Sequence, residues 1–180
     1  MASRPFLAST LCAGLLAGTP PLALADSAGT TLPFKASASV TEWLDPSPTN
    51  ACAGEAPAYG SAALGSSSGN GLSSVIGSFS FTAQDCVTST SPYFLPPYAF
   101  KSREFVITTA SGEQIQGRYE GTSTPLVPGQ LGLNGSFTIT GGTGRFAYAS
   151  GGGTLELIED ISAMPAKGFL QLNGRISRPR

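Results

Sequence analysis

The side chains that could do chemistry in this chain are mostly carboxylic acids and phenols, because its 180 residues include no histidine. Without histidine, the Ser-His-Asp and Cys-His forms of nucleophilic catalysis are excluded. Two carboxyls about 5–10 Å apart across a cleft could instead hydrolyse a glycosidic bond. The acids that lie on strand-like stretches, or end one, are the candidates for such a pair: Glu104, Glu120, Glu156, Glu159 and Asp160.

We expect each of these acids on the outer, solvated face of its strand. An acid that points inward would have a raised pKa, because burial disfavours the charged form, and would become a site candidate. Glu156 is kept as a candidate ligand contact together with Tyr119, Arg145 and Tyr148. The two tyrosines have a simpler interpretation as well, Tyr119 as a core residue and Tyr148 as packing against a glycine-rich turn.

The glycine-rich run Gly141–Gly144 has some likeness to a phosphate-binding loop. It lacks the Lys-Ser/Thr ending and a following helix, so we predict a reversal between strands instead. Arg145, next to it, is predicted to be a solvated turn residue, with an anion contact at a pocket mouth as the alternative. Trp43 lacks the preceding Gly-x of lipocalins and is predicted to lie in the core or to close a barrel end.

The first 25 residues are predicted to be a signal peptide. Arg4 provides a positive start, Phe6–Leu16 a short apolar core, and Leu22–Ala25 the small-x-small pattern of a cleavage site. Cleavage is expected between Ala25 and Asp26. Residues 26–180 are then one exported domain, periplasmic or secreted.

Three cysteines occur in the chain, and one of them, Cys12, lies in the predicted signal peptide. The remaining pair, Cys52 and Cys86, is predicted to form a disulfide, as is usual in exported proteins. Two free buried thiols are the alternative. No metal site or cofactor is expected, because two thiols without histidine fall short of the usual four ligands.

The charge balance gives no reason to expect nucleic acid or an anionic membrane as a partner. The formal net charge is −1, and only 12% of the residues are charged. The chain ends with Ser177–Arg180 rather than with an aromatic strand, and aromatics are 9% of the residues. Both features differ from outer-membrane barrels, so we expect no membrane insertion of the mature chain.

Apolar residues alternate with polar ones along most of the chain, and this period of two predicts strands. The clearest run is 131–140. About eight strands are predicted, counting a short segment at 145–149, and no segment has a helical period. Asn70-Gly71 predicts a hairpin turn over 67–71, and the midpoint between Cys52 and Cys86 falls in this turn.

A second hairpin is predicted from 98–109 and 114–122, joined by a turn at 110–113. Eight antiparallel strands with mostly local connections predict an all-β fold that closes into a barrel. A two-sheet β-sandwich is the alternative, but its Greek-key crossings need longer loops.

Two stretches carry a family resemblance: residues 69–82, leading to Cys86, and residues 137–147 with the Gly-Gly-Thr-Gly-Arg-Phe run, followed by 149–154. Over roughly residues 55–177 the chain resembles exported bacterial proteins of the allene oxide cyclase-like barrel group, whose plant relatives include dirigent proteins. The resemblance implies a calycin-like barrel with an apolar interior. It also implies hydrophobic substrates, which the plant members cyclise or couple, often as homo-oligomers. No catalytic residue of that group aligns with a position here.

Two functions therefore stay open. The chain could be an exported barrel that binds a hydrophobic small molecule or serves as a non-catalytic interaction module. It could also be an isomerase or cyclase that works by shape and one or two polar groups. The second function predicts at least one inward carboxylate, Asn or Tyr in a perturbed environment.

Overall fold

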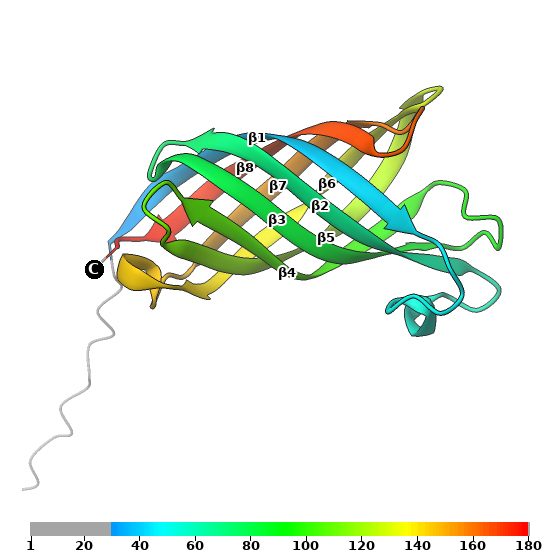
Figure 1. Cartoon of the computed structure of the whole chain (residues 1–180), viewed down its shortest axis with the longest axis horizontal. Helices are drawn as coiled ribbons and strands as arrows, with labels where there is room; N and C mark the ends of the chain where they lie inside the picture. Colours follow the sequence, from blue (N-terminus) through cyan, green and yellow to red (C-terminus); the bar gives the residue numbers. More distant parts are fainter. Residues whose placement is uncertain (1–29, 180) are drawn as a thin grey trace, which may run out of the picture.

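The computed structural model describes residues 30–179, which form a closed antiparallel barrel of eight strands (Figure 1). The strands are β1 (Thr31–Asp45), β2 (Ser61–Ser73), β3 (Gly77–Ser89), β4 (Tyr98–Thr109), β5 (Gln114–Val127), β6 (Gln130–Gly142), β7 (Gly151–Asp160) and β8 (Ala166–Ser177). Each strand pairs with its neighbours in the chain, and β1 pairs with β8. The predicted barrel is confirmed, and the sandwich alternative is wrong.

The signal peptide predicted over residues 1–25 lies outside the described residues. Within residues 30–179, helix is limited to two short 3-10 helices, η1 (Ala53–Glu55) and η2 (Gly144–Phe146). No helix in this range is long and apolar enough to cross a membrane.

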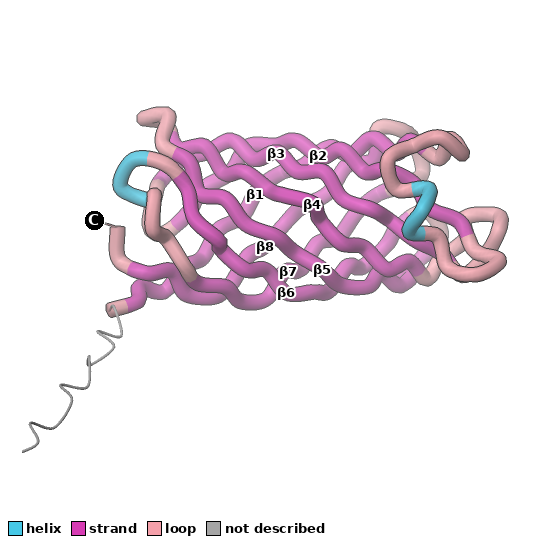
Figure 2. Tube along the Cα trace, turned by 90° about the horizontal axis from the view of Figure 1, so that it is seen from below, coloured by secondary structure: helices cyan, strands magenta, loops and turns pink. Residues whose placement is uncertain are grey.

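The two ends of the barrel differ (Figures 1 and 2). One end, which we call the loop end, carries the longer connections 46–60, 90–97 and 161–165, together with the turn at 128–129. The other end, the turn end, carries the turns 74–76 and 110–113 and the segment 143–150 that contains η2. Because the strands are antiparallel neighbours, every second connection returns to the same end.

The middle and the turn end of the barrel are filled by apolar side chains that alternate with outward polar ones. Phe105 lies at the centre of an aromatic cluster, with ring centroids 6.2 Å from Phe81, 6.2 Å from Tyr119 and 6.5 Å from Phe137. At the turn end, the fully buried Phe146 of η2 joins this core. The interior is therefore closed toward the turn end.

The hairpin predicted around Asn70-Gly71 is wrong in position. Residues 67–71 lie inside β2, and the chain turns at 74–76, so that Ser73 pairs with Gly77. Asn70 points outward, while Gly71 faces inward, where an added Cβ would lie 2.7 Å from the ring of Phe79. The glycine here serves close packing of the barrel wall rather than a turn.

Two further predictions near the barrel ends are wrong. Residues 145–149 are not a strand, because Gly144–Phe146 forms η2 and the following residues turn. Trp43 neither lies in the core nor closes an end: it points outward from β1 and is 59% exposed. It follows the inward-facing Glu42, so the alternation of β1 puts it on the outer face.

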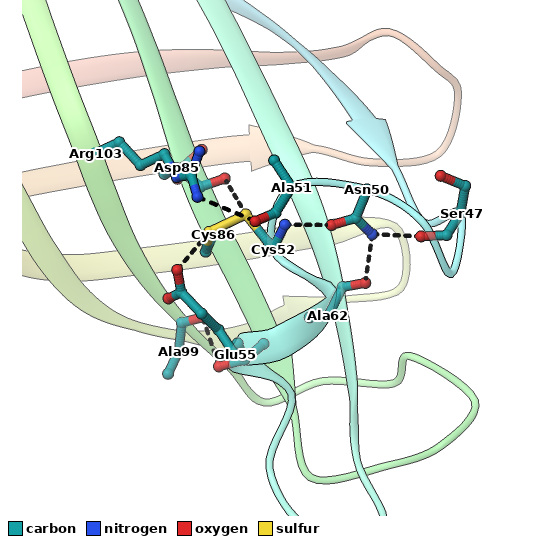
Figure 3. The surroundings of a disulfide bond; sticks show 11 residues. Ser47, Asn50, Ala51, Cys52, Glu55, Ala62, Asp85, Cys86, Ala99 and Arg103 are labelled. Carbon is teal, nitrogen blue, oxygen red and sulfur yellow. Dashed lines mark hydrogen bonds between the residues drawn. A yellow bond between two sulfur atoms is a disulfide. The ribbon is translucent and has the colours of Figure 1, made fainter.

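The pairing of Cys52 with Cys86 agrees with the prediction, since their Cα atoms lie 5.4 Å apart at disulfide geometry (Figure 3). They do not lie opposite each other in a hairpin, because Leu64 is the partner of Cys86 on β2. Cys52 belongs instead to the 46–60 loop. The bond therefore fastens this loop to the outside of β3.

Hydrogen bonds hold the same loop in place (Figure 3). Asn50 is the central residue: its side-chain oxygen accepts from the amide of Cys52 at 2.7 Å, and its Nδ2 donates to the carbonyl of Ser47 at 2.6 Å and of Ala62 at 3.2 Å. Arg103 on β4 donates to the carbonyl of Ala51 at 3.0 Å. The loop is thus a fixed part of the loop end.

Candidate functional site

A cavity of about 130 Å³ lies inside the barrel at the loop end. Most of its wall is apolar, and four of its polar side chains are almost completely buried. The rim includes the half-buried Phe94 and Tyr98 and the exposed Met164, so the cavity reaches the end of the barrel. The buried polar residues in its lining are Glu42, Asp85, Ser123 and Glu159.

The three acids come from alternate strands around the wall. Glu159 is on β7, Glu42 on β1 and Asp85 on β3, and each faces inward because it continues the apolar face of its strand. The intervening strands carry small residues at these levels, with Gly168 paired to Glu159 on β8 and Gly65 paired to Asp85 on β2. Because glycine has no side chain, these positions leave room for three carboxyls on one side of the interior.

Glu42 and Glu159 interact directly. Burial, and next the neighbouring Glu159 carboxyl, raise the pKa of Glu42 to about 8. Burial also raises the pKa of Glu159, against the opposing effect of its hydrogen bond with Glu42. Ser67 donates a further hydrogen bond to Oε1 of Glu42 at 3.3 Å. Two like charges at this depth repel each other, so the pair keeps a proton at neutral pH.

Asp85 completes the cluster from the other side. Burial, and next the charge of Glu42, raise its pKa to about 8. The hydroxyl of Tyr119 is close enough to oppose this rise, and burial, followed by the charge of Asp85, raises the pKa of Tyr119 well above its usual value. Tyr119 is itself held by its backbone amide, which donates to Oγ of Ser102 at 2.7 Å. The cluster can therefore donate as well as accept protons near neutral pH.

Three buried polar atoms on the cavity wall have no hydrogen-bond partner within the described chain. They are Oδ1 of Asp85, Oε1 of Glu159 and Oγ of Ser123. These residues are 4%, 3% and 1% exposed, respectively, so the barrel covers them almost completely. Unpaired buried polar atoms are costly, so their presence at one cavity marks it as a candidate binding site.

A second, smaller cavity of about 30 Å³ lies deeper in the barrel. It shares Glu42 and Asp85 with the larger cavity and continues to Tyr119 and the apolar side chains of Phe81 and Leu170. The carboxyls thus lie between the two spaces. They form the polar floor of the outer cavity, with the aromatic core below.

The four predicted ligand contacts do not come together. Tyr119 is buried and lines the deeper cavity. Glu156 is on the outer face of β7, paired with Asn134 and Gln171.

The other two predicted contacts lie at the turn end, opposite the cavity. Arg145 is in η2, where it forms an ion pair of 3.3 Å with Glu113, and Tyr148 is 84% exposed beside it. None of Arg145, Tyr148 and Glu156 lines either interior cavity.

The sequence-based prediction does not identify the three acids of the cavity as inward-facing, although the alternation of their strands indicates this. Glu159 was expected to face solvent, and this is wrong, because it continues the buried face that carries Leu155. Glu42 and Asp85 are not among the predicted site residues, although Glu42 shares the parity of Phe34, Ala36, Ala38 and Val40, and Asp85 that of Phe79 and Phe81. An acid at an in-step position of an alternating strand is the pattern that identifies an inward carboxyl.

Within residues 30–179, no group of three His, Cys, Asp or Glu side chains is arranged to hold a metal ion. No protein-family model, curated protein or solved structure matches this chain. The resemblance to allene oxide cyclase-like and dirigent-like proteins therefore stays a prediction, and the candidate site rests on its own geometry.

Proposed function

We propose that this protein is an exported binding protein that takes a small, mostly apolar molecule into the loop end of its barrel. The observation that carries the proposal is the cavity of about 130 Å³ that ends on buried, unpartnered polar atoms. An apolar cavity of roughly 150 Å³ is sufficient for a benzene-sized molecule. A few fixed polar groups in an otherwise apolar wall are typical of sites that orient a ligand.

The test uses ring-sized compounds and a variant that fills the cavity. We expect at least one of 2-phenylethanol, 2-phenylethylamine and 3-phenylpropionate to bind with a measurable Kd in isothermal titration calorimetry. Leu44→Trp should reduce this affinity at least about tenfold, because Leu44 lines the cavity. Ile158→Trp is the matched control, since Ile158 is 59% exposed on the outer face of β7.

Two results would contradict this function. One is that none of the three compounds binds. The other is that Leu44→Trp, shown to be folded by its circular dichroism spectrum, binds them as well as the Ile158→Trp control does.

An isomerase is the second candidate, and it is supported by the inward carboxyls, whose raised pKa values suit a general acid. Styrene oxide is a suitable model substrate. Protonation of its oxygen opens the epoxide at the benzylic carbon, a hydride shift gives phenylacetaldehyde, and the proton returns to the acid. Accumulation of this aldehyde with the wild type, and its loss in Asp85→Asn, would support the isomerase. Equal rates for the two proteins would exclude Asp85 as the acid.

A further inference from the structure

The chemistry of the unpartnered atoms narrows the class of ligand. Oδ1 of Asp85 and Oε1 of Glu159 are acceptors whenever their carboxyls are ionised, and Oγ of Ser123 can accept as well. All three line the same cavity. In the ionised state, a ligand head group with several hydrogen-bond donors would satisfy them.

The protein supplies no positive charge of its own to this cavity. Every lysine and arginine within residues 30–179 is exposed, and neither interior cavity has one in its lining. An ionised carboxylate at this depth has no counter-ion, and a buried charge is stable only when it is paired. At neutral pH the cluster avoids this unpaired charge by keeping protons, and a cation from outside the chain would take the place of a proton.

An organic cation fits the surroundings better than a metal ion does. The three carboxyls are not arranged as a metal site, and the wall beside them is apolar. Phe94, Tyr98 and Phe100 line the cavity, with 4.9 Å between the ring centroids of Phe94 and Tyr98. Aromatic faces attract ammonium groups and also pack against an apolar body.

We propose that the ligand of this barrel is a small hydrophobic amine, whose protonated nitrogen is bound by Asp85, Glu159 and Ser123 while its apolar body fills the outer cavity. A primary ammonium has three N–H donors, which equals the number of unpartnered acceptors. This inference rests on the proposed binding function and specifies the chemical class of the ligand.

Binding of an ammonium should release a proton from the carboxyl cluster, whereas binding of a neutral molecule should not. The groups that face Asp85 are Glu42 from β1, Tyr119 from β5 and Glu159 from β7, and the cluster keeps protons at neutral pH. An incoming cation favours the ionised carboxylate, so a proton leaves as the amine binds. The affinity for the amine should therefore rise from pH 6 to pH 8, while that for a neutral alcohol stays constant.

The experiment compares 2-phenylethylamine, 2-phenylethanol and 3-phenylpropionate, which share a phenyl ring and differ in the head group. Calorimetric titration of the full chain is performed at pH 6, 7 and 8, in buffers of different ionisation enthalpy. We expect the amine to bind at least about tenfold more tightly than the other two at pH 8 and to release protons at pH 7. An alkylammonium, like the lysine side chain, stays protonated over this range.

Variants identify the residues that bind the head group. Asp85→Asn should weaken amine binding at least about tenfold and weaken alcohol binding by a smaller factor, because the amide can still form hydrogen bonds but carries no negative charge. Glu156→Gln, which removes a carboxyl from the outer face of β7, should change neither. If Asp85→Asn does not fold, Ser123→Ala provides the same comparison, because it also removes one of the unpartnered acceptors.

The outcomes separate this inference from the function on which it rests. Binding of the alcohol or the acid at least as tightly as the amine, abolished by Leu44→Trp, would overturn the amine and leave the binding function intact. Amine binding without proton release or pH dependence would overturn the role of the carboxyls. Absence of binding by all three compounds would overturn the binding function itself.

Discussion

Gly65 lies between two buried carboxyls, pairing with Asp85 on β3 while an added Cβ would lie 2.6 Å from Oε1 of Glu42 on β1. No side chain fits at this position unless both acids move. The carboxyl cluster thus depends on a residue without a side chain on the strand between its members. This relationship makes Gly65 part of the site, although it offers no polar side chain.

Gly65→Ala should destabilise the protein by about 1–3 kcal/mol, because overpacking displaces groups that are already closely packed. Chemical denaturation provides the measurement. Gly54→Ala is the control, since nothing lies within 4 Å of a Cβ added there, and it should change the free energy of unfolding by less than about 0.5 kcal/mol. Equal effects of the two substitutions would show that Gly65 is not confined by the carboxyls.

The folded protein should lose stability as pH rises from 5 to 8. Glu42 and Asp85 have a pKa of about 8 in the fold, against 4.5 and 3.8 as ordinary values. Between these values the folded state binds more protons than the unfolded state, so the free energy of unfolding decreases with rising pH. The decrease should be about 3 kcal/mol or more, since each pKa unit corresponds to about 1.4 kcal/mol.

The same denaturation series, repeated on variants, assigns this effect to the cluster. Glu42→Gln and Asp85→Asn should each flatten the dependence on pH, because the amide cannot ionise. Glu156→Gln should leave the slope unchanged, as Glu156 is on the outer face. A wild-type protein equally stable at pH 5 and pH 8 would show that the carboxyls ionise freely in the fold.

The Cys52–Cys86 bond should contribute about 3–4 kcal/mol, because it closes a loop with a sequence separation of 34 residues. The Cys52→Ser/Cys86→Ser double variant should therefore have a markedly lower denaturation midpoint than the oxidised wild type. Adding a reductant should lower the wild type to the same midpoint and leave the double variant unaffected. If the reductant also lowered the midpoint of the double variant, its effect on the wild type could not be assigned to the Cys52–Cys86 bond.

The position of the first hairpin turn can be tested with two substitutions. Gly77 has a φ of +72°, and nothing lies within 4 Å of a Cβ added there, so Gly77→Ala should cost about 1 kcal/mol through backbone strain alone. Asn70→Thr, on the exposed face of β2, should be neutral or slightly stabilising. The opposite order of effects would place the turn at Asn70-Gly71.

The alternation of apolar and polar residues was sufficient to predict the barrel, because a strand that buries one face has an apolar residue at every second position. It located β1, β4 and the second hairpin closely, since Gly112, with a φ of +86°, turns the chain where Ala110–Glu113 predicted. It failed at Asn70-Gly71, because a glycine pair permits both a turn and a tightly packed strand. Local sequence cannot distinguish these two uses of glycine.

The site was harder to predict than the fold for a physical reason. Solvent exposure is the usual state of an acid on a strand, and Glu156 follows this rule. Glu159, three residues later, does not, because the odd spacing puts it on the inward face of β7, where its partner on β8, Gly168, leaves space beside it. The alternation of β7 is enough to predict that Glu159 faces inward, but the residue that lies beside it on the next strand, and therefore the space for its carboxyl, cannot be predicted from β7 alone.

The ionisation of Asp85 with and without an amine ligand tests the amine-binding site most directly. Carboxyl ¹³C shifts of aspartate-labelled protein, with the Asp85 signal assigned by its loss in Asp85→Asn, are followed from pH 4 to pH 9. We predict that Asp85 titrates at about 8 in the free protein and at a clearly lower pH with saturating 2-phenylethylamine. Titration of Asp85 near its ordinary value, or the same titration with and without the amine, would contradict it.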